Sequence, residues 1–190
     1  LAGEGAGYAG GIVSAGLDEV ESPVPDASGR VFLPSRLKSQ AEDNFSSTGT
    51  VSRFDPGFAN RLDVMYGVRS IRGYAYSAVN DRLYVAGGAQ NGGNVLVLEI
   101  NPNTMAVTST GTFTPPASGS CFNCGGAQPY ALAVSPDGTK VTVIAVSGEH
   151  DGHAFDLMFL LRFDRSGGPT MPLLATKDIT GLHLPSAGVG

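Results

Sequence analysis

Residues 74–114 read YAYSAVNDRLYVAGGAQNGGNVLVLEINPNTMAVTSTGTFT, and this stretch decides the fold. It contains short segments rich in β-branched, aromatic and aliphatic residues, which Gly, Asn, Asp or Pro separate from one another. With the glycine that precedes the stretch, these segments are residues 73–77, 82–86, 94–100 and 105–110. Consecutive short strands joined by such turns form an antiparallel meander. The sequence therefore predicts an all-β fold made of four-stranded antiparallel sheets.

Two sequence anchors recur along the chain. The first is a basic residue that opens a short strand directly after a turn, at Arg30, Arg82 and Lys140. The second reads RFDP, EINP and RFDR at residues 53–56, 99–102 and 162–165. From the first to the third occurrence, the first anchor moves by 110 residues (30 to 140) and the second by 109 (53 to 162). Both anchors therefore indicate an average repeat of roughly 55 residues.

A repeated four-stranded meander of this length is typical of a β-propeller blade. We assign blades to residues 9–66, 68–114 and 127–179, with a glycine-rich lead-in over residues 1–16 and a tail over residues 180–190. Propellers usually contain about four to eight blades, and three blades leave sheet edges unpaired. We therefore expect a partial propeller that is completed by further copies of the chain, by other protein subunits or by a continuation of the polypeptide.

Two segments resemble the repeats of a known group of proteins. Residues 82–87, RLYVAG, and residues 130–140, YALAVSPDGTK, are similar to the repeats of YVTN-type and lactonase-like β-propellers. In that group, a strand, a Ser-Pro-Asp-Gly turn and a second strand form the inner half of a blade. The resemblance covers the two later blades and implies the propeller fold. It implies no single function, because the group contains enzymes, binding modules and surface proteins.

The composition argues against some classes of partner. Charged residues make up 15% of the chain, lysine occurs only at positions 38, 140 and 177, and the formal net charge is −5. A protein that binds the phosphate backbone is usually basic, so we expect no nucleic-acid partner. No apolar run approaches the ~20 residues that a membrane-spanning helix needs, so we expect no transmembrane segment. The scarcity of lysine, the high content of Gly, Ser and Thr and a close cysteine pair favour an extracytoplasmic location: periplasm, cell surface or secreted.

The long connections are expected at one end of the blades. Strands of a meander alternate in direction, so the second turn of each blade and the link to the next blade lie at the same end. Long connections there cover residues 34–48, 87–93, 114–127 and 147–155. Loops longer than chain closure requires often carry function. This end is therefore the candidate functional face.

A cluster of histidines and carboxylates lies in one of these connections, residues 148–156, which read GEHDGHAFD. Imidazole and carboxylate ligands suit Zn²⁺ or another divalent first-row metal. The spacing of His150 and His153 can bring both rings to one ion from a tight loop. We therefore name His150, His153, Asp151 and Glu149 as candidate ligands of a divalent metal and expect no other cofactor. The alternative is a solvated hairpin end that binds nothing.

The sequence predicts no catalytic residues, because no serine stands in a nucleophile elbow and no Ser/His/Asp group can be assembled. We therefore expect a non-catalytic scaffold or binding subunit of a cell-surface or extracytoplasmic assembly, with proteins as partners. A metal-assisted hydrolase of the lactonase-like type is the alternative, and it needs ligands from several blades. Asn44, in the triplet Asn-Phe-Ser, fits an N-glycosylation acceptor in a eukaryotic secretory route.

Cys121 and Cys124 are predicted to form a disulfide that pins the connection between the last two blades. No helix is expected there to lower a thiol pKa, as a redox dithiol requires. The sequence around them contains neither a second cysteine pair nor a following histidine, which zinc-ribbon and haem motifs need. Alkylation of the native, non-reduced protein followed by mass spectrometry should leave both cysteines unmodified. Two alkylated thiols would contradict the prediction.

Overall fold

The computed structural model describes residues 17–18, 22–37, 48–89, 93–116, 128–147, 157–165 and 168–180. The strands are β1 (Leu17–Asp18), β2 (Val24–Pro25), β3 (Val31–Leu37), β4 (Thr48–Phe54), β5 (Arg61–Ser77), β6 (Arg82–Ala89), β7 (Val95–Ile100), β8 (Val107–Phe113), β9 (Gln128–Val134), β10 (Lys140–Ser147), β11 (Leu157–Asp164) and β12 (Leu173–Asp178). A 3-10 turn, Pro56–Phe58, precedes β5. Within these ranges, no helix has the length and apolar character needed to cross a membrane.

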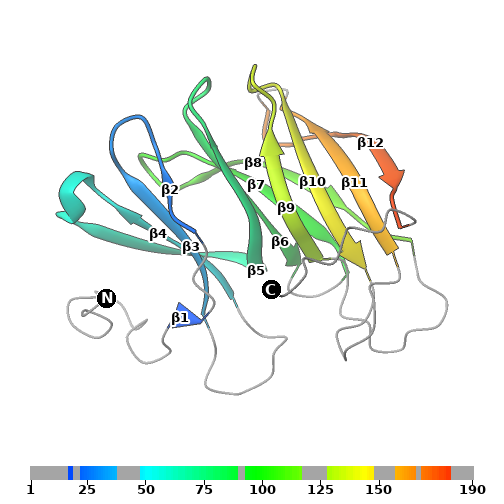
Figure 1. Cartoon of the computed structure of the whole chain (residues 1–190), viewed down its shortest axis with the longest axis horizontal. Helices are drawn as coiled ribbons and strands as arrows, with labels where there is room; N and C mark the ends of the chain where they lie inside the picture. Colours follow the sequence, from blue (N-terminus) through cyan, green and yellow to red (C-terminus); the bar gives the residue numbers. More distant parts are fainter. Residues whose placement is uncertain are drawn as a thin grey trace, which may run out of the picture.

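Antiparallel pairing joins the strands into two sheets (Figure 1). The first sheet has the order β1-β3-β4-β5-β6-β7-β8, with β2 also paired to β3, and the second has the order β12-β11-β10-β9. From β2 onward, strands that pair are also consecutive in the chain, which is the meander that the sequence predicts. The predicted fold class, all-β and β-propeller-like with consecutive four-stranded antiparallel units, is confirmed by this pairing.

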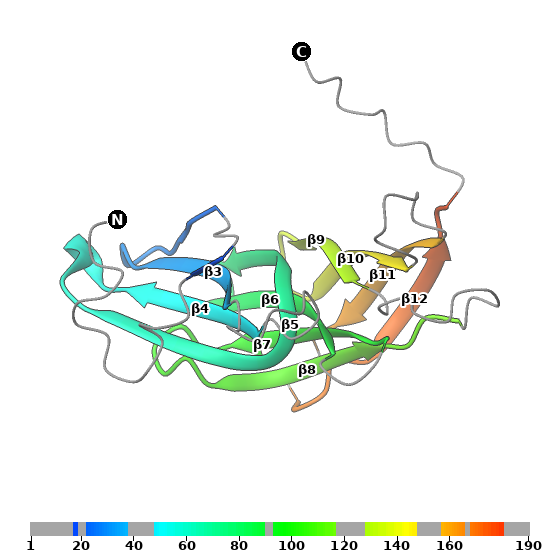
Figure 2. The same ribbon diagram turned by 90° about the horizontal axis from the view of Figure 1, so that it is seen from below.

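Strand β5 belongs to two units at once. Its first half pairs with β4, and its second half, residues 73–77, pairs with β6. Register shifts in both ladders fall between the two halves, where the strand curves (Figure 2). The blade boundary expected near residue 67 therefore lies within one continuous strand. We call β2, β3, β4 and the first half of β5 the first unit; the second half of β5 with β6, β7 and β8 is the second unit, and β9–β12 form the third unit.

Both faces of the second unit are buried. Successive residues of a strand point to opposite faces, and β6 contributes Leu83 and Val85 to one apolar cluster and Tyr84 and Ala86 to another. The first cluster, between the first and second units, is completed by Phe32, Val51, Tyr66, Val68, Ile71, Leu98, Ile100 and Met105. The other, between the second and third units, is completed by Val95, Val97, Phe113, Val141, Val143, Ala145, Phe159, Leu161, Phe163 and Met171.

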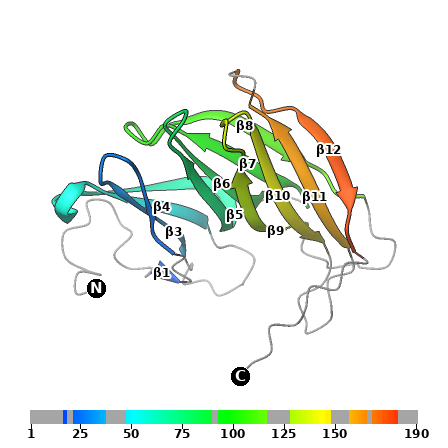
Figure 3. The same cartoon turned by 45° about the horizontal axis from the view of Figure 1, so that its top comes forward.

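The third unit also contacts the second through its β11–β12 loop (Figure 3). Thr110 of β8 donates its backbone N–H to the Pro169 carbonyl at 3.1 Å and accepts a hydrogen bond from the Met171 N–H at 2.9 Å. Thr110 and Thr170 thereby form an isolated parallel bridge. This loop therefore holds the third unit against β8, the outer strand of the second unit.

The close approach of β5 and β9 requires a glycine at position 73. A β-carbon at Gly73 would lie 2.9 Å from the Leu132 β-carbon and 3.1 Å from the carbonyl carbon of Ala131. Gly67, in the same strand, has no neighbour within 4 Å of such a β-carbon. We expect Gly73→Ala to lower the free energy of unfolding by about 1–3 kcal/mol, because the strands must move apart. Gly67→Ala should change it by less than about 0.5 kcal/mol.

Urea denaturation measures both changes. Equal stability of the Gly73→Ala and Gly67→Ala proteins would show that β5 and β9 do not pack this closely.

Candidate functional site

The site residues that the sequence predicts lie outside the described residues. These are the candidate metal ligands Glu149, His150, Asp151 and His153, the cysteines Cys121 and Cys124, and the glycosylation candidate Asn44. They remain predictions. Among the residues that the structure describes, no three His, Cys, Asp or Glu side chains are grouped so that they could hold a metal ion.

The structure does fix where the segments carrying these residues leave the sheets. Residues 38–47, 117–127 and 148–156 follow Leu37 of β3, the end of β8 and Ser147 of β10. Because the strands alternate in direction, these strand ends lie at the same end of the units, opposite the short β2–β3, β5–β6 and β9–β10 turns (Figure 1). We call the two ends the long-connection end and the short-turn end.

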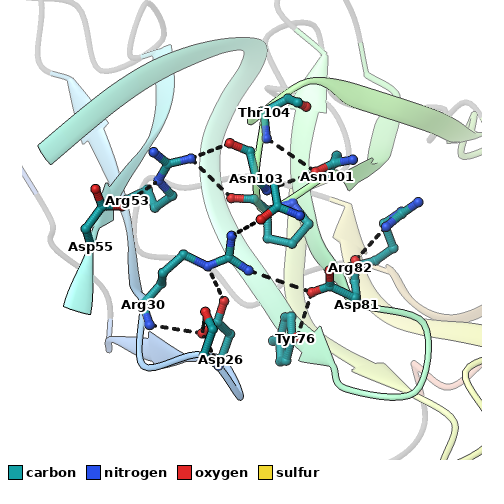
Figure 4. Close-up of polar contacts among 12 residues, drawn as sticks. Asp26, Arg30, Arg53, Asp55, Tyr76, Asp81, Arg82, Asn101, Asn103 and Thr104 are labelled. Carbon is teal, nitrogen blue, oxygen red and sulfur yellow. Dashed lines mark hydrogen bonds and ion pairs between the residues drawn. The ribbon is translucent and has the colours of Figure 1, made fainter. Parts of the chain in front are cut away.

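The short-turn end contains a buried carboxylate, Asp26, in the β2–β3 turn (Figure 4). Its Oδ1 accepts hydrogen bonds from the N–H and the hydroxyl of Ser28 and from the N–H of Arg30, and its Oδ2 accepts one from Arg30 Nε. Burial acts to raise the pKa of Asp26, but these hydrogen bonds outweigh it and hold the pKa below its ordinary value. Asp26 is therefore an anion that shapes the turn and orients Arg30.

Two arginines of the first unit reach across to the β7–β8 loop of the second unit (Figure 4). Arg30 donates to the Asn103 side-chain oxygen, and Arg53 donates to the carbonyl oxygens of Asn103 and Pro102 at 2.5 and 3.4 Å. Asn101 stabilises this loop, because its side-chain oxygen accepts hydrogen bonds from the N–H groups of Asn103 and Thr104. The loop thus presents its acceptors to both cations.

The neighbouring β5–β6 turn provides a carboxylate for the same junction. The Arg30 guanidinium lies 3.8 Å from the Asp81 carboxylate, which also accepts a hydrogen bond from the Tyr76 hydroxyl at 2.8 Å. Burial, this hydrogen bond and the charge of Asp81 raise the pKa of Tyr76 to about 12. Tyr76 therefore remains a neutral donor at physiological pH.

The junction between the second and third units is built on Glu99 of β7, whose side chain is 5% exposed. One carboxylate oxygen accepts hydrogen bonds from the Tyr84 hydroxyl at 2.9 Å and from Arg165 Nε at 2.6 Å. The other accepts a hydrogen bond from the Thr108 hydroxyl at 2.7 Å and lies 3.4 Å from Arg82 Nε. Burial acts to raise the pKa of Glu99, but Thr108, Arg165 and Tyr84 together lower it. Arg165, which comes from the third unit, is therefore paired with a carboxylate of the second.

A second contact at this junction joins two short turns. Asn80 of the β5–β6 turn donates to the Tyr84 hydroxyl and to the Gly138 carbonyl, both at 3.0 Å. Gly138 has φ of 70°, and a β-carbon there would lie 2.9 Å from the Asn80 amide nitrogen. In the third unit, Arg165 donates its N–H to the Thr139 carbonyl at 3.0 Å. The β9–β10 turn therefore fits against the second unit only with glycine at position 138.

These groups serve recognition between units. Both oxygens of Glu99 are occupied by fixed donors, and burial beside Glu99 raises the pKa of Tyr84, so the tyrosine stays protonated. Glu99 is thus an anion that accepts hydrogen bonds. The chemistry of the junctions is charge pairing and hydrogen bonding between neighbouring units.

The sequence contained a signal for these junctions that sequence reasoning did not use. The basic residues at 30 and 82 and the residues at 53 and 99 belong to the two repeat anchors, which by themselves indicate only the period of the repeat. In the structure, Phe32 pairs with Arg53 and Tyr84 pairs with Glu99, so the two anchors face each other across neighbouring strands. A charged residue at the same strand position of each repeat could have indicated a contact between repeats.

No protein-family model matches the sequence, and no curated protein matches it. Among solved structures, the β-propeller domain of the Trilobed protease from Pyrococcus furiosus is similar to this chain, with a sequence identity of 9% and a TM-score of 0.49. The match covers 86% of this chain and 44% of the protease domain. A periplasmic gluconolactonase of Pseudomonas aeruginosa is also similar, with a sequence identity of 15% and a TM-score of 0.45. This match covers 88% of this chain and 58% of the gluconolactonase. The chain thus spans about half the length of the solved structures it matches.

Removal of the Glu99 charge should weaken the junction between the second and third units. We expect Glu99→Gln to lower the free energy of unfolding by roughly 2–4 kcal/mol at pH 7, because Arg165 and Tyr84 lose their anionic acceptor. The pKa of Glu99 is lowered in the folded protein, so its stabilising effect is complete above the ordinary value of 4.5 and is lost as the pH falls through the lower, folded value. The difference between the two proteins should therefore shrink toward pH 3.

Denaturation at several pH values measures this effect. The control is Thr108→Val, which removes one hydrogen bond and should cost about 1 kcal/mol. A double-mutant cycle of Glu99→Gln with Arg165→Met gives the coupling between the units. A coupling energy of zero would show that Arg165 does not hold the third unit through Glu99.

Proposed function

We propose that the chain is a non-catalytic propeller module, a scaffold or binding subunit of a cell-surface or extracytoplasmic assembly that contacts its protein partners through the long-connection end. The observation that supports this most is the different use of the two ends. At the short-turn end, the charged groups Asp26, Arg30, Arg53, Glu99 and Arg165 are all engaged within or between units. The long connections leave the sheets at the opposite end of the units, which is the long-connection end.

The composition of the long connections supports recognition of a partner. Residues 148–156 place two imidazoles and three carboxylates on a connection between paired strand ends, Ser147 and Leu157. Loops held by a rigid scaffold are the usual place for binding groups. The scarcity of lysine and the cysteine pair at 121 and 124 support the extracytoplasmic setting.

A metal-assisted hydrolase of the lactonase-like type is the second candidate. The observation that favours it is the same His-x-x-His connection, since imidazole and carboxylate are ligands for divalent first-row metals. In this case, Glu149, His150, Asp151 and His153 would supply the ligands, and the metal would polarise a carbonyl or activate water.

One loop replacement separates the two candidates. Ser147 and Leu157 are directly paired, so a two-residue Asn-Gly hairpin can replace residues 148–156 without a change of register. We expect this variant to keep its stability. It should no longer bind the proteins that the parent chain binds from an extract of the producing cells. His150→Ala with His153→Ala preserves the loop length and is the matched control, which should retain them.

Metal content and lactone hydrolysis are measured on the same three proteins. The scaffold proposal expects no hydrolysis of an aldonolactone panel with Mg²⁺, Ca²⁺, Mn²⁺ or Zn²⁺ present. Stoichiometric metal and hydrolysis in the parent, both lost in the double histidine variant, would favour the hydrolase and contradict the scaffold.

A further inference from the structure

The three units present the same strand position to the unit that follows. Cross-strand pairing places Arg53 opposite Phe32, Glu99 opposite Tyr84 and Arg162 opposite Thr142. Phe32, Tyr84 and Thr142 each lie two positions after the basic anchor of their repeat, at residues 30, 82 and 140. Arg53, Glu99 and Arg162 are therefore equivalent in the first, second and third units.

In the first two units, the side chain at this position contacts a loop of the next unit. Arg53 donates to the carbonyls of Pro102 and Asn103 in the β7–β8 loop of the second unit. Glu99 accepts from Arg165, which follows β11 in the third unit. Both loops are the last turn of their unit. The equivalent residue of one unit thus recognises the last turn of the unit after it.

In the third unit, the equivalent position is open. Arg162 is exposed, and in the described part of the chain no hydrogen bond or ion pair engages its guanidinium. It borders an open cavity of about 310 Å³ that is lined by Ala133, Val134, Ser135, Lys140, Thr142 and Arg162. The pairing of Thr142 with both Ala133 and Arg162 places these three residues side by side. We call this cavity the Arg162 socket.

The second unit shows what fills such a socket. By the strand pairing, Ser77, Arg82, Tyr84 and Glu99 correspond to Ser135, Lys140, Thr142 and Arg162. In the second unit, Asn80 donates to the Gly138 carbonyl of the third unit, and Glu99 accepts a hydrogen bond from the Arg165 guanidinium of the third unit. The occupant of a socket is therefore a propeller unit, which inserts its first and last short turns.

We propose that the Arg162 socket binds the first unit of a second copy of this chain. The matching residues favour this occupant. Arg162-Phe163-Asp164 repeats the Arg53-Phe54-Asp55 of the first unit, and the last turn of the first unit begins Asp55-Pro56, where that of the second begins Asn101-Pro102. Arg162 on the Pro56 carbonyl of the second copy reproduces the contact that Arg53 makes with Pro102 inside one chain.

Exposed apolar side chains support the same contact. Met65 of the first unit is exposed, and it pairs with Thr50 on the sheet face that is turned away from the second unit. Phe58 is 70% exposed, lies in the same turn as Pro56 and contacts Phe54 edge-on at 5.9 Å. The turn that enters the socket thus also carries an aromatic anchor.

This inference rests on the proposed role as a propeller module, and it concerns the short-turn end and the sheet face, not the long connections. Light scattering after gel filtration, on the full chain at micromolar concentration, measures self-association. We expect a mass of twice the 19.5 kDa of one chain, because two head-to-tail contacts close a ring of two copies. Arg162→Glu should weaken self-association by roughly 30-fold or more. Val79→Glu places a glutamate at another exposed position, 68% exposed on the second unit, and should leave self-association unchanged.

A mixing experiment tests whether these two surfaces contact each other. Phe58→Asp should also give single chains, since it changes the other side of the contact. An equimolar mixture of the Arg162→Glu and Phe58→Asp proteins should form pairs, because one of the two contacts then joins unchanged surfaces. Far-UV circular dichroism confirms that each variant is folded.

Three results would overturn the proposal: a parent chain that stays single with a cooperative melt, an Arg162→Glu chain that associates as well as the parent, or a mixture that stays single. The proposed function has a different failure. If the loop replacement over residues 148–156 still retains the parent's partners, the binding role of the long connections is wrong while the Arg162 socket is unaffected.

Discussion

A four-stranded sheet whose alternate side chains are apolar on both faces cannot bury both faces by itself. The second unit of this chain is such a sheet, because Leu83 and Val85 point one way and Tyr84 and Ala86 the other, and all four are fully buried. Its stability therefore depends on a sheet packed against each face. The close packing at Gly73 and the bridge between Thr110 and Thr170 both follow from this requirement.

Apolar packing alone does not decide which sheet follows which, because one aliphatic face resembles another. The polar junctions at the short-turn end supply the order. Arg53 needs acceptors, which Pro102 and Asn103 provide as carbonyl oxygens, whereas Glu99 needs donors, which Arg165 and Tyr84 provide. If the third unit replaced the second, Arg165 would lie near Arg53, and two half-buried cations would face each other. The charges thus discriminate against wrong neighbours as well as stabilise the right one.

The fold could be predicted from the sequence because its signals are local. Strand segments, turn residues and the two anchors all lie within short windows, and the anchors pair across neighbouring strands. The continuity of β5 could not be predicted in the same way. Tyr66 and Val68 flank Gly67, and both are buried against residues distant in the sequence, so a glycine that suggests a boundary stands inside a strand. The junctions were missed for the same reason. The partners of Glu99 are separated from it by up to 66 residues, and their proximity depends on how whole sheets pack.

Strand β5 carries one uninterrupted backbone from the first unit into the second. Its amides are bonded to β4 in one half and to β6 in the other, so neither unit can open fully without loss of hydrogen bonds along the strand that both units share. The third unit shares no strand with them and is joined to β8 through residues 114–127. In hydrogen exchange, the first two units should therefore behave as one cooperative folding element, and β9–β12 as a second that opens by a smaller, sub-global fluctuation.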